Sequence, residues 1–479
     1  MTDYRLVIIG GGLSGLAAGI RYARFGRKVL ILEKHVKPGG LNSYYRRQGI
    51  LFETGLHAMT NFARPDDRHA PFNRLFRQLK LSRKRFLTHE QIVSEILFPN
   101  GVNLLFSNDF NLLKDEVSTK FPRVIDRFLR LVQIVEDYDP FTPCEWISAR
   151  KRIKDILGPA PAGGNPVEDE LFVNMLLWPL MIYGNSREHD MDFSQFVIMF
   201  RSIFLEGLFR PEGTIKDFLD MLLGHYLSFE GEIRFKSEVE SIYSKGKRIH
   251  GVRLTSGEEI TCDDIISTVG YPGTLRLLDP AVTDDAAQYE GRISFMELIY
   301  LVSVEAKNYL KNDRTIIFYN LDNRFRFCRP DDPINIHSGV ICFPDNFQEV
   351  RDRMKFQGKD VFQIRFTHPA DYDQWRNVSP DEYKEMKIFW CEKSGQETAK
   401  IIGNYLENVV YQDSFTPVTI EKFTAKSQGA VYGSPIKIKN GRTSFENLFI
   451  AGTDQGFLGI VGSMLSGISM VNQHVLEKI

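Results

Sequence analysis

The first forty residues carry the feature that most constrains the fold, a glycine-rich turn between a buried strand and a helix. Residues 5–9 (RLVII) are apolar and mostly β-branched, which is typical of a buried parallel strand. They lead directly into residues 10–15 (GGGLSG). In this pattern Gly10 permits the tight turn, Gly12 lets backbone N–H groups approach a pyrophosphate, and Gly15 lets the next helix lie close to the strand. The N-terminus of that helix adds about half a positive charge, which favours phosphate.

A second strand and an acidic residue complete the unit. Gly26 is placed to end the helix, and residues 28–32 (KVLIL) predict another buried strand that finishes at Glu33. This carboxylate follows the turn by about 20 residues, the spacing at which an acidic side chain accepts hydrogen bonds from an adenosine ribose. Strand, glycine turn, helix, strand and acid in this order predict a dinucleotide-binding domain of the α/β class.

Two further glycine motifs favour FAD over NAD as the dinucleotide. Gly39 and Gly40 follow the acidic residue closely, and residues 447–454 predict a short strand that ends in a Gly-x-Asp motif. Residues 459–462 (GIVG) then open an apolar helix, whose N-terminus could present donors to a flavin pyrimidine ring. Asp454, the acid of the motif, is placed to accept a hydrogen bond from a ribityl hydroxyl.

Together these motifs resemble the phytoene desaturase, carotenoid isomerase and retinol saturase superfamily of FAD-dependent oxidoreductases. The resemblance covers both ends of the chain and a central block at residues 210–269, and the Gly55-Leu56-His57 motif favours the saturase-like branch. It implies a Rossmann-type FAD-binding domain of the amine-oxidase kind, interleaved with an α+β substrate domain that contains an antiparallel sheet. Many relatives carry an arginine after the second glycine pair, whereas this chain has Leu41.

The resemblance also implies a set of cofactor contacts. Val239 corresponds to a valine whose backbone contacts the adenine in the family. The complete set of expected FAD-binding residues is Gly10, Gly12, Leu13, Ser14, Gly15, Glu33, Lys34, Gly40, Leu41, Val239, Gly452, Asp454, Gly459, Ile460 and Val461.

The positions of these motifs predict a discontinuous arrangement of two domains. Residues 1–65, 210–275 and 420–479 form the expected FAD-binding domain, and residues 66–209 and 276–419 form the expected substrate domain. The second insertion contains strand patterns at residues 297–304 and 361–367, followed by a long helix at 381–406 that is expected to be interrupted near Gly395.

Composition excludes several other function classes. A formal net charge of −1 gives no global field that would favour nucleic acid. Five widely spaced cysteines argue against a disulfide framework, and no cluster of cysteine and histidine predicts a metal site. We therefore expect a cytoplasmic protein with no metal, no signal peptide and no membrane span.

One segment suggests contact with a membrane surface. Residues 74–86 interleave six cations with leucine and phenylalanine. Such a segment predicts peripheral association with anionic lipid, from which a lipid-soluble substrate would be extracted. A solvated loop is the alternative interpretation. The sequence leaves the oligomeric state open.

The expected substrate is a small hydrophobic molecule of the polyene or isoprenoid type. Residues 171–183 and 193–209 are apolar and carry methionine and aromatic side chains, which adapt to an extended ligand. Ordinary helix core is the alternative.

The expected reaction is hydride exchange at flavin N5 that saturates, desaturates or isomerises a carbon–carbon double bond. His57, just after Gly55, is the candidate catalytic residue, either relaying a proton or bonding the substrate, with a structural role as the alternative. A quinone, oxygen, a ferredoxin-like protein or transiently bound NAD(P)H would exchange electrons with the flavin. Two other functions stay open: an amine-oxidase-like flavoenzyme, and a non-catalytic FAD-containing protein that binds or escorts lipid.

Overall fold

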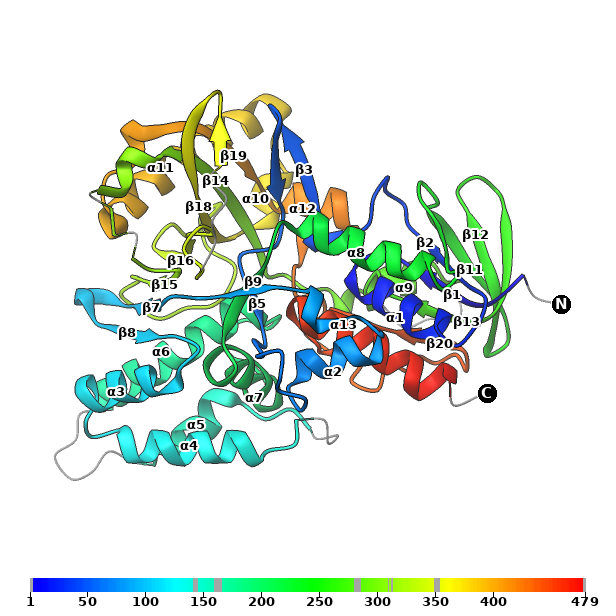
Figure 1. Ribbon diagram of the computed structural model, residues 1–479, viewed down its shortest axis with the longest axis horizontal. Helices are drawn as coiled ribbons and strands as arrows, with labels where there is room; N and C mark the ends of the chain where they lie inside the picture. The colour runs from blue at the N-terminus through cyan, green and yellow to red at the C-terminus, as the bar shows by residue number, and fades with distance from the viewer. Residues whose placement is uncertain are drawn as a thin grey trace.

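A parallel sheet forms the centre of the lobe that contains both ends of the described chain (Figure 1). The computed structural model describes residues 3–140, 145–158, 166–279, 286–308, 310–311, 313–348 and 354–476. Within them the parallel strands lie in the order β10-β2-β1-β13-β20. Their bounds are Glu232–Arg234, Val29–Leu32, Tyr4–Ile9, Glu259–Ser267 and Leu448–Ile450. The sheet brings together segments from the beginning, middle and end of the chain.

The centre of this sheet is buried on both faces, which explains why β2, β20 and most of β1 are apolar. Leu6 and Ile8 of β1 face the helices α1 (Leu13–Ala23), α8 (Ile215–Leu227) and α13 (Gly459–Met470). Val7 and Ile9 face the opposite side, which is covered by α9 (Tyr271–Arg276) and the antiparallel strands β11 (Val239–Lys245) and β12 (Arg248–Leu254). The predicted Rossmann-type α/β domain is confirmed.

The second lobe is built on a mixed, mainly antiparallel sheet of order β19-β14-β18-β16-β15-β7-β8, with β17 beside β18. Its central strands β14 (Ser294–Ser303) and β18 (Lys359–Ala370) contain the two strand patterns expected from the sequence. The remaining strands are β7 (Ser94–Leu97), β8 (Asn103–Phe106), β15 (Ile316–Asn320), β16 (Ser338–Cys342), β17 (Met354–Phe356) and β19 (Val409–Phe415). The expected antiparallel sheet is therefore confirmed.

Helices cover both faces of this second sheet. One face packs on α11 (Pro380–Ile402), and the other on an apolar helical layer. That layer consists of α3 (Phe110–Lys120), α4 (Ile125–Asp137), α5 (Ala149–Leu157), α6 (Pro166–Gly184) and α7 (Phe193–Phe200). The predicted interruption of α11 near Gly395 is wrong: the helix is continuous, and Gly395 instead allows close packing, since a Cβ there would lie 2.9 Å from Leu406.

Short elements connect the lobes and complete their edges. Between the two sheets lie a hairpin, β3 (Tyr44–Arg47) with β4 (Ile50–Glu53), and a small sheet of order β5-β9-β6. The strands of the small sheet are Met59–Thr60, Leu208–Pro211 and Thr88–Glu90. Three helices, α2 (Pro71–Gln78), α10 (Tyr372–Arg376) and α12 (Pro417–Thr424), complete the fold.

The basic segment at residues 74–86 is tied into the first lobe. The apolar residues of α2, among them Phe72 and Phe76, are buried against that lobe. The Arg83 guanidinium donates to the Ala63 carbonyl at 2.9 Å and to Asn73 at 3.0 Å, so it serves the fold. The other cations of the segment, Arg74, Arg77, Lys80, Lys84 and Arg85, are exposed on the surface. Contact of this segment with a membrane stays a prediction. In the part of the chain that the structure describes, no helix is long and apolar enough to cross a membrane.

Candidate functional site

The predicted cofactor turn lies where β1 passes into α1. Gly10 has φ +100° and Gly15 is so close that a Cβ there would lie 2.0 Å from the Gly10 carbonyl oxygen. Gly12 is the N-terminal cap of α1, and a Cβ added to it would meet nothing closer than the Gly39 carbonyl oxygen at 4.0 Å. The turn is thus tightly packed on its inner side and open at Gly12, as the approach of a phosphate requires.

Glu33 ends β2 beside this turn. Its carboxylate accepts the Gly11 N–H at 2.7 Å and the His35 N–H at 2.8 Å, and the side chain is buried. Lys34 follows it and is half-buried. The Glu33 carbonyl accepts the Ser237 N–H at 2.9 Å, which places the start of β11, at Val239, close to the end of β2. Glu33 and Val239, the two residues expected to contact the adenosine of FAD, are therefore close to each other.

The second glycine pair packs against the first turn. The Gly39 N–H donates to the Gly11 carbonyl at 3.0 Å, and a Cβ on Gly40 (φ +57°) would lie 3.7 Å from the Gly12 Cα. The Leu41 carbonyl accepts the Thr54 hydroxyl at 2.7 Å. The backbone of residues 39–41 therefore forms a rim of the turn.

The C-terminal motif reaches the same place from the other end of the chain. Gly452 (φ +93°) lies beside Ser14, and Gly467 in α13 packs so closely that a Cβ would lie 2.1 Å from the Ser14 carbonyl oxygen. Helix α13 begins at Gly459, with Ile460 and Val461 buried in its first turn. Helices α1 and α13 thus pack against each other, with the first turn of α1 beside the later part of α13. The partial positive charge at the N-terminus of α1, next to the open side of Gly12, favours an anionic ligand.

Asp454 is buried and makes only contacts within the protein. Its carboxylate accepts the Tyr271 N–H at 2.6 Å and the Ser434 N–H at 2.8 Å. The expected bond from this side chain to a ribityl hydroxyl stays a prediction.

The residues at the turn fit a dinucleotide. The Ser14 hydroxyl is buried and has no hydrogen-bond partner among the described residues, and it lies at the N-terminus of α1 beside Leu13 and Gly452. An unpaired buried donor next to an open glycine is what a pyrophosphate oxygen would satisfy.

Replacing Gly12 with alanine separates cofactor binding from folding. Its φ of −72° suits any residue and the added methyl group meets no atom of the protein, so the apoprotein should keep its thermal midpoint. The methyl group would occupy the approach of the pyrophosphate, and we expect at least tenfold weaker FAD binding in a titration of apoprotein followed by flavin fluorescence. Unchanged affinity would show that the turn does not hold the cofactor.

His57 lies between the rim of the glycine turn and the start of α13. Thr54 before it is bonded to Leu41, and Thr60 after it lies beside Gly459, where an added Cβ would be 3.7 Å from the Thr60 hydroxyl. The segment that carries His57 is therefore fixed at one end to the rim of the turn and at the other to the start of α13. Its imidazole is partly exposed (14%), and the Tyr183 ring stacks near it with centroids 6.5 Å apart.

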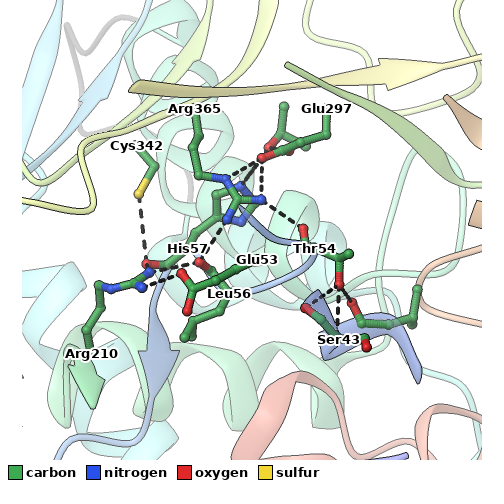
Figure 2. A network of polar contacts seen from close by, with 11 residues as sticks. Ser43, Glu53, Thr54, Leu56, His57, Arg210, Glu297, Cys342 and Arg365 are labelled. Atoms are coloured by element: carbon green, nitrogen blue, oxygen red, sulfur yellow. Dashed lines mark hydrogen bonds and ion pairs between the residues drawn. The ribbon is translucent and has the colours of Figure 1, made fainter. Parts of the chain in front are cut away.

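A buried polar network holds the His57 side chain (Figure 2). Nε2 lies 2.9 Å from a Glu297 carboxylate oxygen and 3.1 Å from the Thr367 hydroxyl, which itself donates to Glu297. These acceptors assign the proton to Nε2 and leave Nδ1, which has no partner among the described residues, as an acceptor.

Two arginines fix the backbone at His57, one from the large sheet of the second lobe and one from the small sheet between the lobes. Arg365 of β18 bonds Glu297 at 2.7 Å and donates to the carbonyls of Leu56 at 3.1 Å and Thr54 at 2.8 Å. Arg210 of β9 donates to the carbonyls of Leu56 at 2.8 Å and His57 at 3.0 Å, and forms an ion pair with the buried Glu53. Figure 2 shows both guanidinium groups converging on this turn. The imidazole is therefore preorganised.

The charges of the network set the protonation state of His57. Burial lowers the pKa of His57 from its usual 6.5, with the neighbouring Arg365 acting in the same direction and Glu297 opposing them. Burial alone would raise the pKa of Glu297, but Arg365 and His57 outweigh it and hold the pKa of this carboxyl well below its usual range. At neutral pH the site contains a neutral imidazole hydrogen-bonded to a carboxylate.

Next to His57 lies the largest apolar cluster of the second lobe. It joins α6 and α7 to one face of the large sheet, and includes Phe295, Phe318 and Trp178. The Tyr183 ring meets Phe318 edge-on at 4.8 Å, and Tyr432 donates a hydrogen bond to the Ile182 carbonyl at 2.6 Å. The predicted apolar segments 171–183 and 193–209 both contribute to this cluster, and Tyr183 at the end of the first lies near the His57 ring.

The polar partners of His57 were not anticipated from the sequence. Glu297 and Arg365 occur as single charges inside the apolar strand patterns, and Arg210 was noted only as the first residue of the central block at 210–269. A lone charge at an inward position of a buried strand is the signal that could have identified the first two, since unpaired buried charges are avoided.

Comparison with known proteins identifies the family of the chain and solved structures with the same fold. A family model described as flavin containing amine oxidoreductase matches residues 13–352. The all-trans-retinol 13,14-reductase of Danio rerio is 21% identical, covering 99% of this chain and 87% of that protein, and the chloroplastic prolycopene isomerase of Daucus carota is 26% identical, covering 97% and 79%. An oxidoreductase structure from Methanosarcina mazei shares the fold with a TM-score of 0.66 at 15% identity, covering 98% of this chain and 100% of that one.

Proposed function

The chain belongs to the flavin containing amine oxidoreductase family and uses FAD, and on this premise we propose that it transforms carbon–carbon double bonds of a polyene or isoprenoid-type lipid. Two relatives that align with nearly the whole chain are an all-trans-retinol 13,14-reductase and a prolycopene isomerase. Saturation, desaturation and isomerisation all fit this proposal.

The observation that carries the proposal is the position of His57. The side chain is held between the cofactor loops and an apolar cluster, with one ring nitrogen bonded to Glu297 and the other an unpaired acceptor. This arrangement places one proton-accepting atom beside a region suited to a hydrophobic chain.

We assign the roles of the residues as follows. When bound, FAD supplies a hydride donor or acceptor at N5. His57 Nδ1 accepts a proton from the substrate in the desaturation direction and returns it in the reduction direction. Glu297 stabilises the imidazolium that forms, and Arg365 keeps that carboxylate ionised. The surrounding cluster is mainly apolar and would exclude water from the reacting carbons.

The same proposal assigns the cofactor contacts and domain limits. Residues 1–65, 210–275 and 420–479 would hold FAD through the expected glycines, Glu33 and the start of α13. Residues 66–209 and 276–419 would enclose the substrate. Support comes from the convergence of the turn at Gly12, the rim at Gly40 and the loop at Gly452.

Anaerobic reoxidation tests the proposed function. FAD-loaded protein is reduced with dithionite and mixed with all-trans-retinol or prolycopene, while flavin absorbance is followed and the lipid is analysed by chromatography and mass spectrometry. Flavin reoxidation with a saturated product, or isomerisation catalysed by the reduced protein, is the expected result. Lipid that binds and is recovered unchanged under reduced and oxidised conditions would contradict the proposal and indicate an escort protein.

Replacing His57 with glutamine tests the assigned proton transfer. The amide keeps the size of the side chain and bonds Glu297, but it accepts no proton, so we expect the single-turnover rate to fall by about 10²–10⁴. Bound FAD should be unchanged. The exposed His337 gives a matched control, since His337→Gln should keep the full rate. Full turnover by the His57 variant would reduce the residue to a structural role.

A further inference from the structure

One wall of the apolar cluster contains a group of buried polar atoms that no residue satisfies. They are the indole N–H of Trp178, the hydroxyl of Tyr183, both amide atoms of Asn320 and the hydroxyl of Ser338; none has a hydrogen-bond partner among the described residues. Trp178, Asn320 and Ser338 are fully buried. An unsatisfied buried polar group costs about 1–3 kcal/mol, so four such residues in one region call for a ligand.

Sheet register places two of the four side by side. Asn320 of β15 is paired with Ser338 of β16 across the antiparallel ladder, so their side chains lie next to each other on one face. Phe318 lies two residues before Asn320 and therefore shares this face, which is the face occupied by Glu297 and Thr367.

Helix α6 places the other two residues, Tyr183 and Trp178, beside strand β15. Tyr183 packs on Phe318 with ring centroids 4.8 Å apart. Trp178 packs on Phe325 and Phe327, in the loop that follows Asn320. The helix thus lies along β15, with Tyr183 toward the middle of the strand and Trp178 toward its end.

The chemistry of these groups selects the kind of ligand. They offer donors from an indole, two hydroxyls and an amide, together with hydroxyl and amide acceptors, and none of them is charged. Arg150 lies over the Phe325 ring and is already paired with Glu170 and Asn174, and Arg365 on the same sheet face is already paired with Glu297. A neutral oxygen atom is therefore preferred over a carboxylate, whose charge would be left buried without a counter-ion.

We propose that Trp178, Tyr183, Asn320 and Ser338 bind the neutral hydroxyl or carbonyl end group of the hydrophobic substrate. This inference rests on the proposed function, because it takes the apolar cluster beside His57 as the substrate region. It goes further in predicting an oxygen-bearing lipid rather than a pure hydrocarbon. With Tyr183 stacked near His57, the end group would lie a short way along the chain from the reacting carbons.

Three molecules with the same polyene chain test the proposal: all-trans-retinol, the hydrocarbon that lacks its hydroxyl, and retinoic acid. Their dissociation constants for oxidised, FAD-loaded protein are measured by quenching of protein fluorescence, without turnover. We expect the alcohol to bind about tenfold more tightly than either the hydrocarbon or the acid, as two new neutral hydrogen bonds would give. Asn320→Leu and Ser338→Ala should each reduce this preference to about threefold or less.

Matched controls keep the outcome clear. Ser202 is also buried in this lobe, but its hydroxyl already donates to the Met199 carbonyl at 3.1 Å, so Ser202→Ala should keep the full preference. Ser338→Ala removes a single atom and keeps the test available if Asn320→Leu fails to fold. Equal binding of alcohol and hydrocarbon, or a preference untouched by both variants, would overturn the proposal. If the binding proposal were overturned in this way but the hydrocarbon still reoxidised the flavin, the proposed function would stand. If none of the polyenes reoxidised the flavin, both the binding proposal and the proposed function would be wrong.

Discussion

Replacing Arg365 with methionine should lower the free energy of unfolding by about 3–5 kcal/mol, the largest stability effect that we expect from a side-chain change. Arg365 is fully buried, and its removal would leave Glu297 as a buried charge whose remaining partners are neutral. The carbonyls of Thr54 and Leu56 would lose a donor at the same time. Denaturant unfolding of the FAD-loaded protein, followed by flavin fluorescence and circular dichroism, measures the loss.

Two further variants make this prediction specific. Arg253 and Glu259 form a pair of which each side chain is 52% exposed, so Arg253→Met should cost less than about 1 kcal/mol. Adding Glu297→Gln to Arg365→Met removes the stranded charge and should restore part of the lost stability. An Arg365 variant as stable as the Arg253 variant would show that the Arg365–Glu297 ion pair does not stabilise the network at His57.

Replacing Gly15 with alanine should abolish FAD binding and destabilise the first lobe by at least about 3 kcal/mol. The added Cβ would lie 2.0 Å from the Gly10 carbonyl oxygen and 3.2 Å from its carbonyl carbon, and both are backbone atoms that no rotamer change can move. The N-terminus of α1 would have to shift away from β1. FAD content of the purified protein and its thermal midpoint measure the two effects.

A helical glycine elsewhere in the lobe supplies the control. Gly224 lies in α8, and a Cβ added there meets no atom within 4 Å. Gly224→Ala should therefore bind FAD normally and be slightly more stable, because alanine favours helix over glycine by up to about 1 kcal/mol. If Gly15→Ala behaved like this control, the close contact between α1 and β1 would not exist.

The elements that could be predicted from the sequence are those with local signals. The β1–α1–β2 unit was found because its strand pattern, its glycines and Glu33 are adjacent in the chain. The strands β14 and β18 were found from their runs of apolar residues, and α13 from its glycine start. In each case the interactions that specify the element lie within the element itself.

Pairing between distant segments could not be predicted in this way. Residues 66–209 were assigned to the substrate domain, but nothing local indicated that β7 from this region pairs in parallel with β15 and extends the large sheet. At Gly395 the breaker signal failed, because a helix tolerates glycine where a neighbour such as Leu406 needs the space.

In the candidate site, too, the local motif could be predicted, whereas the contacts between distant segments could not. His57 was identified from a short motif, but the residues that hold it are distant from it in the chain. They are Arg210, Glu297, Arg365 and Thr367. Nothing local in those strands indicates that their side chains meet at one imidazole. The unpaired group around Asn320 likewise depends on the register between β15 and β16 and on the placement of α6.

A crystal structure of the FAD-loaded protein with a bound polyene tests the central claim most directly. We expect the isoalloxazine ring of the FAD to lie between the loop at Gly40 and the start of α13 at Gly459. We also expect polyene carbons between that ring and His57, with Nδ1 turned toward the ligand. A polyene bound away from the ring, or an imidazole sealed from both by protein atoms, would contradict the central claim.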